Sequence, residues 1–199
     1  RPTVAVYNLA NPSGDQRMET LSTTVTDTVA LSLALMGAYD VVRLEESISR
    51  DRVSETAAQY GYEGVVYGEA VQDEIGYSIT ASVYDLIEER VTVDEAIQFE
   101  SVLDAFGVSD RLVVALMEGI TGETVSYGSL RVVADTGEPF RTEIDGIDMG
   151  VGFAGVDTLL SGVHEIAFFQ ERGAEEVQVD LQVFDLPPDG SVTVTPEIP

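Results

Sequence analysis

Residues 3–44 decide the fold, and they run TVAVYNLANPSGDQRMETLSTTVTDTVALSLALMGAYDVVRL. The segment from Thr3 to Leu9 is β-branched and largely apolar, which predicts a buried strand bounded by turn residues. Ser13 and Gln16 have the S-x-x-Q spacing of a capping box, which predicts the start of a helix. The segment from Tyr39 to Leu44 predicts a second strand, so the stretch forms a β-α-β unit.

The helix within this unit is predicted from one apolar face. Gly37 stands where such a helix would end. Leu31 and Leu35 make the second half of the helix apolar nearly all round. We therefore expect that end either to be buried between a sheet and another helix or to touch a partner. The face itself repeats in steps of three and four residues and consists of Met18, Leu21, Val25, Val29, Leu33 and Met36.

The alternation of strand and helix continues to residue 122. Further helices are predicted from Ser49 to Gly61 and from Ser109 to Gly122. The resulting order β-α-β-α-β-β-β-α requires parallel strand pairs first and antiparallel hairpins later. We therefore predict one mixed-sheet α/β domain over residues 1–122. Three more strands complete it, at residues 64–71, 77–83 and 90–99.

The pattern changes after residue 122, where short β runs separated by glycine-containing turns replace the helices. The glycine-rich segment at residues 146–155 is interpreted as turn or bulge glycines. We predict a separate, small all-β sandwich domain over residues 128–199, so the whole chain is of the α+β or α/β class. Its expected strands lie at residues 129–133, 140–144, 163–169, 177–183 and 191–195.

Composition excludes several functions. The chain of 199 residues has 36 acidic side chains, 10 basic ones, no cysteine and a formal charge of −26. That charge opposes nucleic acid as a partner and direct binding to an anionic membrane surface. All basic residues except one histidine are arginine, which excludes Schiff-base chemistry, and the lack of cysteine excludes thiolate catalysis. The acidic surface fits either a halophilic or alkaliphilic source or a simple compositional bias.

Candidate catalytic groups are few. His164 has no second histidine or cysteine to act with, and we interpret it as structural. Paired carboxylates such as Glu45 with Glu46, or Glu88 with Glu89, are the chemistry of glycoside hydrolases, but so acidic a chain produces them by composition. No nucleophile elbow, dinucleotide fingerprint or P-loop occurs. We predict no catalytic residue, no cofactor and no metal.

A binding module is the alternative to this interpretation. Carboxylates in adjacent turns offer the oxygen ligands that calcium prefers, although the EF-hand order is absent. Two tyrosines that we expect to be exposed suit a carbohydrate instead. The carboxylates are Asp135, Glu138, Asp145 and Asp148, and the tyrosines are Tyr77 and Tyr127.

Contact candidates follow from the predicted topology. In open α/β sheets the loop after the first strand often forms the ligand crevice, which points to the loop of residues 8–17. Helix capping is the other interpretation of its polar residues. With the apolar end of the helix included, the partner-contact candidates are Asn11, Ser13, Asp15, Arg17, Leu31 and Leu35.

The first domain resembles the TolB amino-terminal-like, FlgO-like and CsgG/LpoB-like domains of the cell envelope. The residues that carry this resemblance are the strand at residues 4–9, the loop Ser13-Gly14-Asp15, the segment from Tyr60 to Gly68, and Val83-Tyr84-Asp85. The resemblance implies a mixed α/β fold and a non-enzymatic envelope protein that works by protein contact.

The second domain is similar to PEGA-type β modules. The similarity is carried by residues 128–132, by Ile144-Asp145-Gly146 and by residues 162–166. Together the two resemblances imply a location in the periplasm, at the outer membrane or at the cell surface. Their implied partner is an envelope protein, the chain itself included. Because the chain begins at Arg1 and not at Met, we expect a removed signal peptide, a lipoprotein anchor or a longer product upstream.

These observations favour an envelope protein that acts by contact. A carbohydrate- or calcium-binding module is the alternative, and a hydrolase that uses paired carboxylates is the third interpretation.

Overall fold

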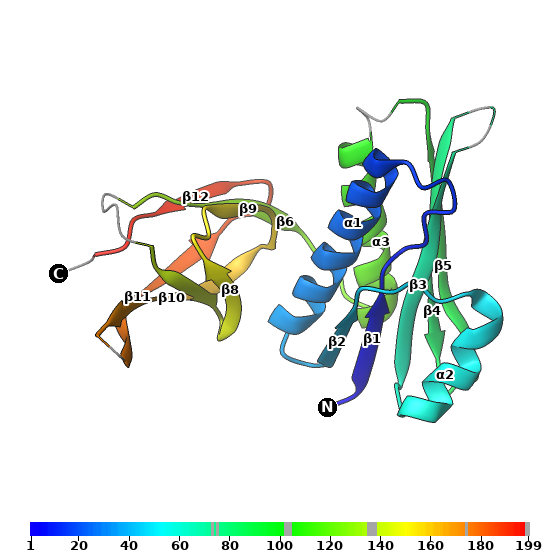
Figure 1. Cartoon of the computed structure of the whole chain (residues 1–199), viewed down its shortest axis with the longest axis horizontal. Coiled ribbons are helices and arrows are strands. Elements are labelled where there is room, and N and C mark those ends of the chain that lie inside the picture. The colour runs from blue at the N-terminus through cyan, green and yellow to red at the C-terminus, as the bar shows by residue number, and fades with distance from the viewer. Residues whose placement is uncertain (73, 75, 102–104, 135–138, 174, 198–199) are drawn as a thin grey trace. The chain divides into compact units, whose positions relative to one another are not determined.

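Figure 1 shows the computed structural model of the chain. It describes residues 1–72, 74, 76–101, 105–134, 139–173 and 175–197. The chain divides into two compact units, Arg1–Thr124 and Val125–Pro199. The first is a mixed α/β unit and the second is built from strands, which confirms the predicted fold class.

The first unit contains a five-stranded sheet in the order β2-β1-β3-β4-β5. β1 is parallel to both β2 and β3, whereas β4 and β5 are antiparallel additions, as predicted. Its strands are β1 (Thr3–Tyr7), β2 (Asp40–Leu44), β3 (Gly64–Gln72), β4 (Tyr77–Asp85) and β5 (Arg90–Phe99). Its helices are α1 (Gln16–Leu35), the 3-10 turn η1 (Arg50–Arg52), α2 (Val53–Tyr60) and α3 (Ala105–Thr121).

The helices of this unit cover opposite faces of the sheet. β2 is the neighbour of β1 at one edge, and the chain then crosses back over β1 so that β3 pairs with its other edge. Because both crossovers favour the right hand, α1 and α2 must lie on different faces. Figure 1 shows α1 and α3 on one face and α2 on the other.

β1 is buried on both faces, and this explains its continuous apolar sequence. Ala5 and Tyr7 pack with Val65, Val53 and Ala57 in a core cluster under α2. The alternate residues of β1, Val4 and Val6, are buried as well and point to the opposite face. On α1 the predicted apolar face is buried at Met18, Leu21, Val25, Val29 and Leu33.

The second unit has two sheets, in the orders β11-β10-β7-β8 and β12-β6-β9. Phe168 is fully buried, and its ring packs edge-to-face on Phe140 with ring centroids 5.3 Å apart. Leu130, Leu159 and Ile166 complete the buried centre. The strands are β6 (Tyr127–Val132), β7 (Arg141–Ile144), β8 (Ile147–Val151), β9 (Gly155–Leu160), β10 (Gly162–Arg172), β11 (Glu175–Leu186) and β12 (Ser191–Val194).

Two strands of this unit were absent from the sequence-based expectation. The glycine-rich segment predicted as turns or bulges contains β8 and the start of β9. Gly146, Gly150, Gly152 and Gly155 nevertheless have positive φ angles, so glycine is needed there as expected. These strands were not predicted because glycines interrupt the alternation of apolar and polar residues.

Candidate functional site

The loop before α1 is held by its own polar side chains. Asp15 is the N-cap residue, and its Oδ1 accepts a hydrogen bond from the Arg17 backbone N–H at 2.8 Å. Ser13 instead donates to Asn11 Oδ1 at 2.8 Å and accepts from the Asp15 N–H. The predicted capping box of Ser13 and Gln16 is therefore wrong. The helix begins at Gln16. The Asp15 carboxylate before it accepts a hydrogen bond from a free backbone N–H and is stabilised by the positive end of the helix dipole.

The predicted contact residues of this loop lie together. Asn11 Nδ2 donates to the backbone oxygen of Asp15 at 2.9 Å and to Glu19 Oε2 at 3.1 Å. Arg17 forms an ion pair with Asp15, with 3.2 Å between Nη2 and Oδ2. The polar groups of the loop are therefore largely engaged in ordering the start of α1. Their role in binding a partner stays a prediction.

We expect Asp15→Ala to lower the thermal midpoint of the first unit by a few degrees near neutral pH. The Arg17 side chain and backbone N–H hydrogen-bond the Asp15 carboxylate and lower its pKa. A lowered pKa means that folding favours the charged form, so this stabilisation exists above the unfolded pKa and disappears as the pH falls through the folded one. The difference between the two proteins should thus vanish in acid. Ser13→Ala, which removes no cap, should cost less; an equal loss would contradict the assignment of Asp15.

The apolar end of α1 is partly covered. Leu33 is fully buried, whereas Leu31 and Leu35 are half-buried. α1 lies beside α3 on the same face of the sheet (Figure 1). Each of the two leucines is thus covered in part and accessible in part. Contact of Leu31 and Leu35 with a partner stays a prediction.

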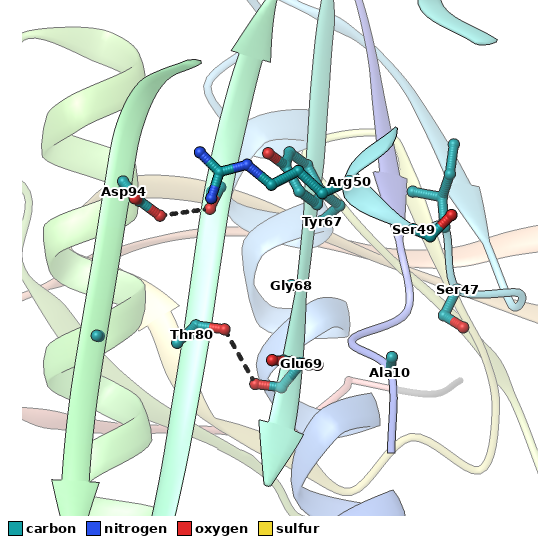
Figure 2. A pocket seen from close by; sticks show the side chains of 12 residues that line it. Ala10, Ser47, Ser49, Arg50, Tyr67, Gly68, Glu69, Thr80 and Asp94 are labelled. Carbon is teal, nitrogen blue, oxygen red and sulfur yellow. Dashed lines mark hydrogen bonds between the residues drawn. The ribbon is translucent and has the colours of Figure 1, made fainter. Parts of the chain in front are cut away.

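A pocket of about 540 Å³ lies at the carboxyl ends of β1 and β2, and we call it the switch-point pocket. β1 stands between β2 and β3, so the strand order reverses there, and open α/β sheets bind ligands at this place. The loop after β1 contributes only Ala10. The loop after β2 forms one wall and β3, β4 and β5 form the floor (Figure 2). The lining includes Ser47, Ser49, Arg50, Tyr67, Glu69, Thr80, Ser82 and Asp94.

The loop of residues 8–17, which the sequence pointed to as the ligand crevice, reaches this pocket only at Ala10, and sequence reasoning missed the other lining residues. The candidates Asn11, Ser13, Asp15 and Arg17 do not line the pocket. The alternation of polar residues along β4 was the available signal, because polar residues on one face predict a side of the sheet that no helix covers.

A second exposed surface lies in the second unit, and we call it the β10–β11 outer face. Val163, Val183 and Leu181 are 71%, 67% and 48% exposed. Cross-strand pairing places Val163 opposite Asp185 and Val183 opposite Glu165. The surface therefore combines exposed apolar side chains with acidic neighbours.

His164 is buried on the other face of β10. Its Nδ1 lies 2.6 Å from Asp145 Oδ2, and its Nε2 lies 2.6 Å from the backbone oxygen of Leu160. Both contacts are to oxygen atoms that accept hydrogen bonds. The ring thereby joins the β7–β8 turn to the end of β9, which agrees with the structural interpretation of this histidine.

We expect His164→Gln to reduce the unfolding free energy of the second unit by about 2 kcal/mol, because two buried polar contacts are lost. Chemical denaturation measures the difference. Glu165→Gln, at the adjacent exposed position, should change stability by no more than about 0.5 kcal/mol. Equal effects of the two substitutions would show that the ring contributes little.

The proposed calcium ligands are occupied or lie outside the described residues. Asp145 accepts from Glu165 N–H besides facing His164, and Asp148 accepts from Gly150 N–H. Asp135 and Glu138 fall outside the described residues. Within the part of the chain that the structure describes, no three histidine, cysteine or acidic residues are grouped to hold an ion.

The other candidate groups are placed as follows. Tyr77 and Tyr127 are half-buried and not exposed as expected, and Tyr77 stacks on Phe99 with centroids 5.4 Å apart. A free aromatic platform at Tyr77 is therefore not formed. The acidic pairs considered for hydrolysis, Glu45 with Glu46 and Glu88 with Glu89, are exposed. Glu88 forms an ion pair with Arg90.

Among the described residues, no helix has the length and hydropathy needed to cross a membrane.

Comparison with known proteins gives distant similarities only. No family model and no curated protein matches the chain. TolB from Acinetobacter baumannii is 13% identical with a TM-score of 0.48, and the match covers 93% of this chain and 47% of that one. The chain thus spans about half the length of that protein.

Two further solved structures match part of this chain. A PelC dodecamer from Paraburkholderia phytofirmans is 17% identical, with a TM-score of 0.37 and coverage of 58% of this chain and 87% of that chain. Lipoprotein GNA1162 from Neisseria meningitidis is 17% identical, with a TM-score of 0.33 and coverage of 62% and 99%. At these identities and scores we assign no family to the chain.

Proposed function

We propose that this chain is a non-enzymatic protein of the cell envelope, in the periplasm or at the surface, that acts by contact with a cationic protein partner. The observation that carries the proposal is the β10–β11 outer face. The sequence resemblance of residues 4–9 and 60–68 to envelope domains supports the location.

The outer face offers apolar area for binding. Val163 and Val183 lie diagonally across the β10–β11 pair, and Leu181 follows two residues from Val183 on the same side of the strand. We call these three exposed side chains the stripe; Ala167, which pairs with Leu181, is buried and adds no accessible area. Burying each large apolar side chain contributes on the order of 1–2 kcal/mol, so a partner that covers the stripe gains several such contributions.

The charges around the stripe select the partner. Glu165 and Asp185 lie between the apolar residues of the stripe, opposite Val183 and Val163. Glu143, on the neighbouring strand β7, pairs with Ala167. Arg141, on the same face, is ion-paired with Glu143 and Glu176, so it offsets Glu143 but forms no ion pair with Glu165 or Asp185. A second copy would bring the same negative groups and be repelled, whereas a basic rim around an apolar centre would be complementary.

The experiment is photo-crosslinking at position 165 in envelope preparations of the source organism. The matched variants are Val183→Asp, on the outer face, and Ile87→Asp, at an exposed turn of the first unit. We expect the wild type and Ile87→Asp to label the same basic protein, less at higher salt, and Val183→Asp to lose it.

Three results would overturn the proposal. One is a cytoplasmic location in cell fractionation. Another is unchanged labelling by a correctly folded Val183→Asp variant. The third is a crosslink between two copies, with a dimer in sedimentation that Val183→Asp abolishes, because the partner would then be the chain itself.

A further inference from the structure

We infer that the switch-point pocket binds a neutral sugar of one or two rings. The pocket lies in the first unit and is lined by residues from Ala10 to Ala96, whereas the contact face proposed above belongs to the second unit. Its volume of about 540 Å³ is in the range of small-molecule sites.

The floor of the pocket is a polar surface formed by three strands. One row of cross-strand neighbours runs from Tyr67 through Ser82 to Asp94. The adjacent row runs from Glu69 through Thr80 to Ala96, which pairs with Thr80. These side chains share one face of the sheet, since residues two apart on a strand point the same way.

The floor is polar because no crossover helix covers it. α2 lies against β1 and β3, and its core cluster with them includes Tyr67. β4 and β5 join by hairpins and bring no helix of their own to this face. The loop between β2 and α2 therefore forms a wall beside an open polar sheet, and the pocket lies between them (Figure 2).

The floor is ordered before a ligand arrives. Ser82 Oγ donates to Asp94 Oδ1 at 2.6 Å, which fixes one carboxylate oxygen and leaves the other available as an acceptor. Ser82 itself is buried. Thr80 Oγ1 lies 3.5 Å from the backbone oxygen of Glu69 (Figure 2). A positioned carboxylate binds with less loss of side-chain entropy.

The wall supplies the complementary donors. Figure 2 shows the Arg50 side chain extending over the floor in the direction of Asp94. Within the described part of the chain, its guanidinium forms no ion pair. Ser47, on the same loop, adds a hydroxyl group, whereas the Ser49 hydroxyl donates to the carboxylate of Asp51.

This combination matches the chemistry of sugar hydroxyls. Carboxylates only accept hydrogen bonds, a guanidinium only donates them, and hydroxyl groups do both. A sugar hydroxyl also does both, so one ring can donate to Asp94 or Glu69 while it accepts from Arg50. The two carboxylates and one arginine leave the pocket net negative, which disfavours acidic ligands.

The experiment follows backbone amide shifts of the full chain by NMR during titration with D-glucose, N-acetylglucosamine and cellobiose at millimolar concentrations. We expect at least one of them to shift the amides of Gly68, Glu69, Thr80 and Ser82. Asp94→Asn and Arg50→Gln should each weaken that binding about tenfold, the effect of one charge-assisted hydrogen bond. Asp157→Asn, an exposed acid of the second unit, should leave it unchanged.

Glycine is the competing probe, because its ammonium and carboxylate groups would pair with Asp94 and Arg50. Shifts with glycine but with no sugar would replace the inference by a zwitterion site. The inference is also wrong if no sugar moves these amides, or if Asp94→Asn binds as the wild type does with an otherwise unchanged spectrum. A negative result here leaves the crosslinking outcome for the β10–β11 outer face unaffected.

Discussion

Phe168→Ala is expected to unfold the second unit at room temperature. The side chain is fully buried and packs edge-to-face on Phe140. Removing a buried phenylalanine ring costs about 3–5 kcal/mol, from the lost transfer free energy and the cavity that remains. A small domain has roughly 5 kcal/mol of total stability, so a single such loss removes most of it.

Amide NMR spectra and denaturant titration measure this effect. The signals of β10 and β11 should collapse toward the unfolded range in Phe168→Ala. Val163→Ala is the matched control, because Val163 lies on the same strand but is 71% exposed, and it should change stability by about 0.5 kcal/mol or less. Similar unfolding midpoints for the two variants would contradict the packing described for this unit.

Gly68→Ala is expected to destabilise the first unit by about 3 kcal/mol or more. A Cβ atom at Gly68 would stand 2.0 Å from the backbone oxygen of Thr80 and 2.8 Å from the Cα atom of Ala81. Both obstacles are backbone atoms of β4, held by pairing on either side. They cannot move away without breaking hydrogen bonds at the floor of the switch-point pocket.

The matched control is Gly64→Ala on the same strand, where the nearest atom to a new Cβ would be Val4 Cγ2 at 3.4 Å. That side chain can adjust, so we expect a change of about 1 kcal/mol or less. Thermal unfolding of both variants tests the difference. A Gly68→Ala protein as stable as Gly64→Ala would show that β3 and β4 do not approach as closely as described.

The first unit was predictable because its signals are local. A strand buried on both faces needs a continuous apolar run, and residues 4–7 supply one. The periodic face of α1 and the glycine after it fix the helix over most of its length. Two crossovers then require parallel pairing of β1 with β2 and β3.

The errors have physical causes too. Ser13 and Asp15 are both good capping residues, and the backbone of the loop decides between them. In the second unit, glycines with positive φ interrupt β8 and the start of β9, so no alternation was visible. The tyrosine at position 77 looked available, but stacking on Phe99 covers it.

The sequence by itself determined the order of the elements in the first unit and their parallel and antiparallel pairing. Both depend on periodicity and on chain connection. Only the tertiary structure decided where side chains meet. The switch-point pocket brings together residues from 10 to 96 because the sheet order places β1 between β2 and β3. On β10, both Phe168 and Val163 are apolar, and packing against the second sheet buries the first and leaves the other exposed.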